Sequence, residues 1–294
     1  MTTLEALVLG IIQGVFMFVP VSSTSHLALA QHVLIGGGSE IPAPDSPEMI
    51  LFDIVVHVGT LVSIVVVMRK PLARLVRGLW SDTRSLSGAA ATSPVTTRIR
   101  TGQLTYIRLA LLGTVTVAVT GVIGLLIRAF GTEVFATPAL IATALIATGV
   151  ILWWTDTVGP GWRGTAQLTV WVAIGIGVAQ AAALIPGLSR SGLTIAMALA
   201  LGLYRPLAAQ FSFFVAIPTI LSAAAVQGWS VIRAGEMTIH LGSYTVAFVA
   251  AAVVGAVALA LVLKLLYAAK FRYFAIYVWG LALFVLIAQP VTYT

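Results

Sequence analysis

The chain has 294 residues, of which 60% are hydrophobic and 9% are charged, and its mean hydropathy is +1.06. Charged residues make up about a quarter of an ordinary soluble domain, so this composition excludes that class and predicts a protein whose solvent is lipid. The absence of cysteine excludes disulfides and thiolate metal sites.

Apolar runs recur along the whole chain, and most approach the roughly 20 residues that cross a bilayer as a helix. In chain order they are Ala6–Val21, Ile50–Met68, Ala110–Ile127, Pro138–Trp154, Thr169–Ile185, Leu207–Val226, Tyr244–Leu263 and Tyr273–Ala288. Because lipid offers no hydrogen bonds to an open backbone, only helices and closed barrels span it. We therefore predict an all-α, multi-pass integral membrane protein, a helical bundle with a single membrane domain over residues 1–294.

Charge predicts which side of the membrane each connection faces. Eight basic residues lie from Arg69 to Arg108, opposed by Asp82 alone, so the positive-inside rule predicts a cytoplasmic loop at approximately 69–105. The segment from His32 to Met49 has three acidic residues and no Lys or Arg, and we expect it outside. Since the net charge of +7 is concentrated in a membrane-flanking loop, we expect no nucleic-acid partner.

The first apolar run has no basic flank before it and ends in a serine cluster. We therefore expect it to remain in the mature protein, because a cleavable signal peptide begins with a basic segment.

Two polar segments interrupt the apolar runs and resemble one another. Pro20–His26 aligns with Pro186–Gly192, and Pro47–Ser63 aligns without a gap with Pro206–Ser222, so that Pro, Phe, Val, Thr and Ser coincide. These matches indicate an internal repeat. The alternative is that proline and glycine are simply common in membrane helices.

The repeat divides the chain into halves of approximately 1–155 and 160–294. Each half reads as an apolar segment, a Pro/Ser break, a short apolar segment and a helix that starts after a proline. Such interrupted segments are typical of transporter-like folds, which place the site at the repeat interface near the middle of the membrane. We expect an inverted relation between the halves and two broken, re-entrant segments.

Arg190 lies in the second break beside Ser189, Ser191 and Thr194. A cation at membrane depth costs several kcal/mol unless it is paired or hydrated, so its presence indicates a functional site. Hydroxyls, backbone N–H groups at a broken-helix start and a guanidinium fork favour a phosphate or diphosphate ligand. The alternative is an interfacial arginine that reaches water.

The first break supplies Ser22, Ser23, Ser25 and His26. A serine hydroxyl attacks phosphorus when a base removes its proton, and an imidazole three residues away lies within one helical turn. We predict Ser23 as the nucleophile and His26 as the acid and base; alternatively, Ser23 only caps a helix.

Asp53 and His57 are four residues apart and face the same side of a helix. Asp53 is either an interfacial cap or a carboxylate that holds a divalent ion or orients His26.

These motifs resemble those of the undecaprenyl-diphosphate phosphatases of the bacitracin-resistance type. Gly10–His26 is similar to the first family signature and Pro186–Thr194 to the second, while Phe52–Gly59 and Phe211–Pro218 resemble further family segments. The resemblance covers nearly the whole chain. It implies an enzyme that removes the terminal phosphate from undecaprenyl diphosphate outside the bacterial cytoplasmic membrane, which recycles the carrier lipid of cell-wall peptidoglycan synthesis.

The resemblance places Ser23, His26, Ser189, Arg190 and Thr194 on family active-site positions. The first signature departs at the position where the family has a glutamate, because this chain has Met17, four residues after Gln13. A thioether neither binds Mg²⁺ or Ca²⁺ well nor accepts a proton. Either Asp53 supplies the carboxylate for a divalent ion, or the reaction relies on Arg190 and His26 with little metal, or hydrolysis is lost.

The resulting hypothesis is a membrane hydrolase of polyprenyl diphosphates with an outward-facing site. We assign catalysis to Ser23, His26 and Arg190, substrate binding to Ser22, Ser25, Ser189, Ser191, Thr194 and Gln13, and metal binding to Asp53. The alternatives are a non-hydrolysing lipid-phosphate transporter or scramblase and an enzyme acting on another prenyl diphosphate. The expected partners are the lipid substrate, the bilayer and a second copy in a homodimer.

Overall fold

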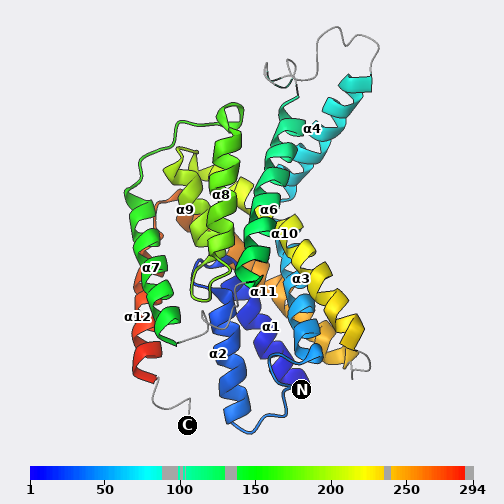
Figure 1. Cartoon of the computed structure of the whole chain (residues 1–294), viewed down its shortest axis with the longest axis vertical. Coiled ribbons are helices and arrows are strands. Elements are labelled where there is room, and N and C mark those ends of the chain that lie inside the picture. The colour runs from blue at the N-terminus through cyan, green and yellow to red at the C-terminus, as the bar shows by residue number, and fades with distance from the viewer. Residues whose placement is uncertain (88–98, 100–101, 103, 130–137, 235–239, 289–294) are drawn as a thin grey trace.

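The computed structural model describes residues 1–87, 99, 102, 104–129, 138–234 and 240–288. Within these ranges the chain forms helices and no β-strand, which confirms the all-α prediction (Figure 1). The elements are α1 (Thr3–Phe18), α2 (Ser23–Gly36), α3 (Pro47–Val67), α4 (Arg69–Ser87), α6 (Thr105–Ala129), α7 (Pro138–Thr157), the 3-10 helix η2 (Thr165–Gln167), α8 (Val170–Ala182), α9 (Arg190–Ala200), α10 (Arg205–Ala234), α11 (Leu241–Tyr267) and α12 (Arg272–Ala288).

Five of these helices, α3, α6, α7, α10 and α11, are long and apolar enough to cross a membrane. This confirms a multi-pass membrane protein. Helices α1, α8 and α12 are apolar but shorter. At about 1.5 Å per residue, the 16 residues of α1 and the 13 residues of α8 fall short of a hydrocarbon layer of about 30 Å.

Both predicted breaks separate two short helices. Helix α1 ends at Phe18, before Pro20, and α8 ends at Ala182, before Pro186; proline disfavours helical geometry in the residue before it and removes a backbone donor. The α1–α2 hairpin opens toward the end of the bundle where the N-terminus lies, and the α8–α9 hairpin opens toward the opposite end (Figure 1). The tips meet where Ser191 Oγ donates to the Phe18 carbonyl oxygen at 3.3 Å.

Helices from the first part of the chain pack against helices from the second part. Helix α1 packs against α11 and α8 packs against α6, while α3 pairs with α10 and α7 with α12. This is the pattern expected if α1, α2, α3, α6 and α7 correspond in order to α8–α12. The inverted relation and the boundaries at 1–155 and 160–294 stay predictions.

Close packing of small residues fixes α1 against α11. A Cβ atom on Gly10 would lie 2.5 Å from the Ala247 carbonyl oxygen, and one on Gly14 would lie 3.0 Å from the Ala251 carbonyl oxygen. Glycines spaced four apart let helix backbones approach in a membrane, where van der Waals packing replaces the hydrophobic effect. This contact sets the position of the first hairpin against a spanning helix.

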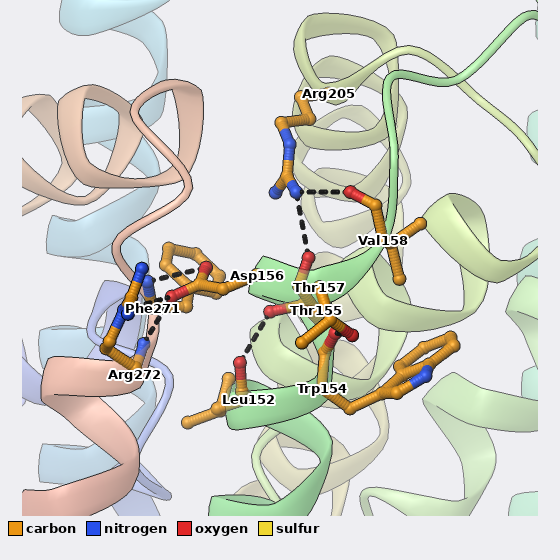
Figure 2. A network of polar contacts seen from close by, with 9 residues as sticks. All are labelled: Leu152, Trp154, Thr155, Asp156, Thr157, Val158, Arg205, Phe271 and Arg272. Carbon is orange, nitrogen blue, oxygen red and sulfur yellow. Dashed lines mark hydrogen bonds and ion pairs between the residues drawn. The ribbon is translucent and has the colours of Figure 1, made fainter.

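Polar caps brace the helices at the end of the bundle opposite the N-terminus (Figure 2). The Asp156 carboxylate accepts from the backbone N–H groups of Phe271 and Arg272 at 2.9 and 2.8 Å, and pairs with the Arg272 Nε at 3.6 Å. Arg205 donates from Nη2 to two carbonyl oxygens at the C-terminal end of α7, 2.8 and 2.9 Å away. A carboxylate at a helix N-terminus and a cation at a helix C-terminus both complement the helix dipole.

The basic segment expected as a loop at 69–105 begins as a helix. Apolar residues recur at Leu72, Leu75 and Leu79, which gives α4 an apolar stripe between its arginines. The Asp82 carboxylate accepts from the backbone N–H groups of Tyr106 and Ile107, which ties α4 to the start of α6. Residues 88–98, 100–101 and 103 of that segment lie outside the described residues.

The α1–α11 contact predicts that Gly14→Val destabilises the protein. The new side chain would meet the backbone of α11 at about 3.0 Å, and overpacking of this kind costs about 1–3 kcal/mol. The thermal unfolding midpoint in detergent should fall relative to Gly121→Val, the matched control on α6, where a Cβ atom meets nothing within 4 Å. Equal midpoints for the two variants would contradict the close contact.

Candidate active site

Arg190 is the first residue of α9 and lies half-buried at the tip of the second hairpin. The N-cap of this helix is Ser189, whose Oγ accepts from the Gly192 N–H at 3.2 Å. Among the described residues the single ion pair is Arg272 with Asp156, so no carboxylate in the described part of the chain pairs with the Arg190 guanidinium. A helix N-terminus and an unpaired guanidinium together attract an anion.

The hydroxyls of the second break hold its backbone in place. Thr148 on α7 accepts from the Ser189 N–H at 3.3 Å and donates to the Gly187 carbonyl oxygen at 3.0 Å. Gly187 has φ +93°, and a Cβ atom there would lie 2.6 Å from a carbonyl oxygen of α7. The tip therefore needs glycine for both its conformation and its close contact with α7.

Ser191 and Thr194, both predicted to bind substrate, make contacts within the protein. Ser191 Oγ contacts the Phe18 carbonyl oxygen, as described above, and lies 3.4 Å from Ser189 Oγ. Thr194 Oγ1 donates to the Arg190 carbonyl oxygen at 2.8 Å. All three hydroxyl-bearing side chains are buried, with exposed fractions of 4% or less. In this arrangement they position the Arg190 turn and dock the two tips.

The first break contains a strained residue. Ser22 adopts φ +68° in the left-handed region, which is uncommon outside glycine. It is the N-cap of α2, so Ser23 is not a cap but the first helical residue. Ser22 Oγ lies 3.1 Å from Ser25 Oγ. Within the described residues the half-buried Ser23 hydroxyl has no hydrogen-bond partner, and its role as the nucleophile stays a prediction.

His26 is buried and both of its ring nitrogens are engaged. Its Nδ1 lies 2.7 Å from the Ser22 carbonyl oxygen, and because a carbonyl only accepts, Nδ1 carries a proton. Its Nε2 lies 2.9 Å from the Tyr277 hydroxyl, and the ring stacks on Phe16 with centroids 3.8 Å apart. With both nitrogens engaged in this way, the imidazole makes no hydrogen bond to Ser23 in this arrangement, and the role of His26 as acid and base stays a prediction.

Tyr277 of α12 is a site residue that sequence reasoning missed. It lies 251 residues from His26 in the chain. It sits in an apolar run without a polar motif, and nothing in the sequence distinguishes it from an interfacial tyrosine.

Met17 lies between Gln13 and Arg190. Gln13 Nε2 donates toward the Met17 sulfur at 3.5 Å, and Arg190 Nη2 approaches the same sulfur at 3.9 Å. Gln13 Oε1 is buried and has no partner among the described residues. A thioether is a weak, uncharged acceptor, so this position leaves the charge of Arg190 uncompensated.

Asp53 lies in the second turn of α3, since that helix begins at Pro47 with Ser46 as its cap. The interpretation of Asp53 as an interfacial cap is therefore wrong. Its Oδ1 is buried without a partner among the described residues, and its carbonyl oxygen accepts from His57 Nδ1 at 2.7 Å. The His57 ring lies within electrostatic reach of Arg190, so α3 adds a second imidazole to the surroundings of the guanidinium.

The residues at the site do not fit a resident Mg²⁺ or Ca²⁺ ion. No group of three His, Cys, Asp or Glu side chains in the described ranges gathers to hold a metal. Asp53 offers one carboxylate, Gln13 one amide oxygen, and Met17 a sulfur that hard ions disfavour. The assignment of Asp53 to a divalent ion stays a prediction, and no chemical step below is derived through a metal.

Comparison with known proteins agrees with the sequence signatures. The sequence model of the family described as bacitracin resistance protein BacA matches residues 6–284. Two undecaprenyl-diphosphatases are each 47% identical to the chain: that of Halorhodospira halophila over 283 residues, 96% of this chain and 96% of the relative, and that of Alkalilimnicola ehrlichii over 279 residues, 95% and 93%. The undecaprenyl-diphosphatase of Carboxydothermus hydrogenoformans is 34% identical over 98% of both chains. The chain therefore belongs to the bacitracin resistance protein BacA family.

Proposed function

We propose that this protein is an undecaprenyl-diphosphatase that removes the terminal phosphate from undecaprenyl diphosphate within the membrane. The observation that carries this proposal is the Arg190 guanidinium, which lies without a carboxylate partner in the described chain at the N-terminus of α9. A diphosphate supplies the negative charge and the pairs of phosphoryl oxygens that the planar guanidinium fork binds with two hydrogen bonds. The family membership of the chain supports the same reaction.

The chemistry begins at the Ser23 hydroxyl, which has no other partner in the described residues. Ser23 Oγ attacks the terminal phosphorus while its proton passes to His26 Nε2, which the Tyr277 hydroxyl must release. The bond from phosphorus to the bridging oxygen breaks, and undecaprenyl phosphate leaves. Arg190 stabilises the charge that develops on the phosphoryl oxygens and the leaving oxygen. His26 then gives the Nε2 proton to the oxygen of the leaving undecaprenyl phosphate. Neutral again, it takes a proton from a water molecule that attacks the phosphoserine. The bond from phosphorus to Ser23 Oγ breaks, Ser23 Oγ takes that proton back from His26, and inorganic phosphate is released.

The remaining site residues contact the bound diphosphate or hold the groups that bind it. Ser22 and Ser25 present hydroxyls beside Ser23, and the buried Gln13 amide lies beside the thioether that contacts Arg190. Ser189, Ser191 and Thr194 fix the turn that aims the guanidinium.

The orientation and assembly are also part of the proposal. We place the protein in the bacterial cytoplasmic membrane with the basic helix α4 in the cytoplasm. The α1–α2 hairpin then opens outward, on the side of the acidic segment that carries Glu40 and Asp45. A homodimer is the proposed assembly.

Arg190→Ala tests the proposed role of the guanidinium. Removing a charged transition-state donor lowers kcat by about 10²–10³-fold, so phosphate release from a long-chain prenyl diphosphate in detergent should nearly disappear. Arg190→Lys should recover only part of the rate, because an ammonium lacks the planar fork. The control is Arg233→Ala, which removes an exposed arginine stacked over Trp229.

Full phosphate release by Arg190→Ala would exclude the proposal. Movement of the lipid headgroup across liposomes by the wild type without phosphate release would instead select the transporter alternative.

Tyr277→Phe tests whether the tyrosine occupies the nitrogen of His26 that acts as the base. The variant keeps the aromatic ring but loses the hydroxyl 2.9 Å from Nε2. Because this hydroxyl must leave Nε2 before the proton transfers, removing a hydrogen bond of about 1 kcal/mol should raise kcat by up to roughly fivefold, with KM nearly unchanged. Tyr273→Phe on the same helix, where the residue is 57% exposed, is the matched control. A lower kcat for Tyr277→Phe would contradict this account of the base.

Met17→Glu tests the part that metal plays. A carboxylate beside Arg190 and the Gln13 amide would add a hard, charged ligand where the thioether has none. We expect phosphate release by the wild type to be insensitive to a chelator and release by Met17→Glu to depend on Mg²⁺ or Ca²⁺. Met17→Leu, which adds no charge, is the control. Chelator-sensitive release by the wild type would contradict the donor set described above.

A further inference from the structure

A groove separate from the Arg190 site runs between α4, α6 and α10. One part of it is a cavity of about 270 Å³ whose apolar walls include Leu109, Gly113, Val117, Val215 and Pro218. A second cavity of about 140 Å³ continues it toward the beginnings of α6 and α10 and shares four of its lining residues. The two cavities therefore adjoin, and the one that reaches Pro218 is lined almost wholly by apolar residues.

The mouth of this groove is basic. Arg74 lines the second cavity, and a depression beside it is lined by Arg69, Lys70, Arg74 and Arg77. Arg77 Nε donates to a backbone carbonyl oxygen of α4, while no hydrogen bond or ion pair of Arg69, Lys70 or Arg74 occurs among the described residues. Among the described residues that line the three cavities, none is acidic. The positive charge at the mouth is thus left for a ligand.

The walls of the groove are held by specific contacts. The Tyr106 ring lies against Gly78, where a Cβ atom would come within 2.2 Å of the ring, so α4 and α6 touch directly. The Asp82 carboxylate caps the start of α6 with two hydrogen bonds, as described above. Asp82 is the carboxylate nearest in sequence to the four cations of α4, and it is therefore already hydrogen-bonded to α6.

The groove lies where a phospholipid would meet it. Helix α4 follows the spanning helix α3 after a single residue, so Arg69 and Lys70 stand at the end of a membrane span. Trp80, 62% exposed on α4, is a residue type that favours the membrane interface. The cavities run from the beginnings of α6 and α10 toward Pro218, and the exposed residues Ala110 and Thr114 lie in their wall.

We propose that this groove binds an anionic phospholipid of the membrane leaflet on the α4 side. Its phosphate contacts Arg74 and the neighbouring cations Arg69, Lys70 and Arg77, and one acyl chain occupies the apolar cavity beside Gly113. Basic residues at the end of a span bind anionic lipid headgroups. A nucleic acid or an acidic protein would use the cations but leave the apolar cavity without a ligand, which is why the lipid is favoured.

Lipid retention by the full-length protein in detergent tests the proposal. Native mass spectrometry would compare phosphatidylglycerol with phosphatidylcholine of identical chains, and glycerol 3-phosphate would serve as the headgroup without chains. We expect the wild type to retain phosphatidylglycerol at a concentration at least about tenfold lower than phosphatidylcholine. The double variant Lys70→Gln/Arg74→Gln should lose this preference, whereas Arg233→Gln should keep it.

A cavity-filling variant tests the acyl chain separately. Gly113→Leu adds a side chain whose Cβ would meet only Val215 Cγ1 at 3.7 Å, an ordinary contact, so the variant should fold. It should weaken retention of both lipids, and the control Gly121→Leu on the same helix should not.

Three results would overturn the proposal: equal retention of the two lipids by the wild type, an undiminished preference in the double variant, or displacement of phosphatidylglycerol by glycerol 3-phosphate or an oligonucleotide at the concentration of the lipid itself. None of these measurements uses phosphate release, so their failure is distinct from failure of the proposed hydrolysis.

Discussion

A guanidinium inside a membrane protein requires anionic, hydrogen-bonding or aqueous surroundings, and Arg190 obtains few of these from the described residues. Helix α9 begins at Arg190, so the unpaired backbone N–H groups of its first turn lie beside the guanidinium. The break that creates this helix start exposes polar backbone to the interior of the bundle. Thr148 and Ser189 satisfy part of that backbone, while Ser191 donates to the Phe18 carbonyl oxygen of the first break.

Hairpins that do not cross the bilayer must be held by helices that do. The first hairpin is held by glycines on α1 that contact the α11 backbone, and the tip of the second by Gly187 against α7. In both cases the small residue allows an approach that side chains would prevent. This rigidity matters for phosphoryl transfer, in which positioning and electrostatics supply most of the catalysis.

The sequence predicted the elements whose signal is local. Apolar runs gave the helices, and Pro20 and Pro186 gave both breaks, because hydropathy and proline geometry act over a few residues. It also predicted that Arg190 begins a helix. It did not predict the helical start of the basic segment, whose amphipathic spacing was hidden by its charges, or the partner of His26. Tyr277 lies 251 residues away, and only the packing of α12 brings it to the imidazole.

The thioether of Met17 changes the charge balance around the guanidinium rather than its position. A carboxylate there would neutralise Arg190 before substrate arrives, so a diphosphate would need a metal ion or would have to displace that carboxylate. With a neutral sulfur 3.9 Å away, the charge of Arg190 is not balanced at this position, and in the proposed function the diphosphate supplies the missing anion. On the proposed chemistry, cleavage then removes part of that negative charge from the lipid. The lipid product binds the cation less tightly than the substrate did, which favours its release.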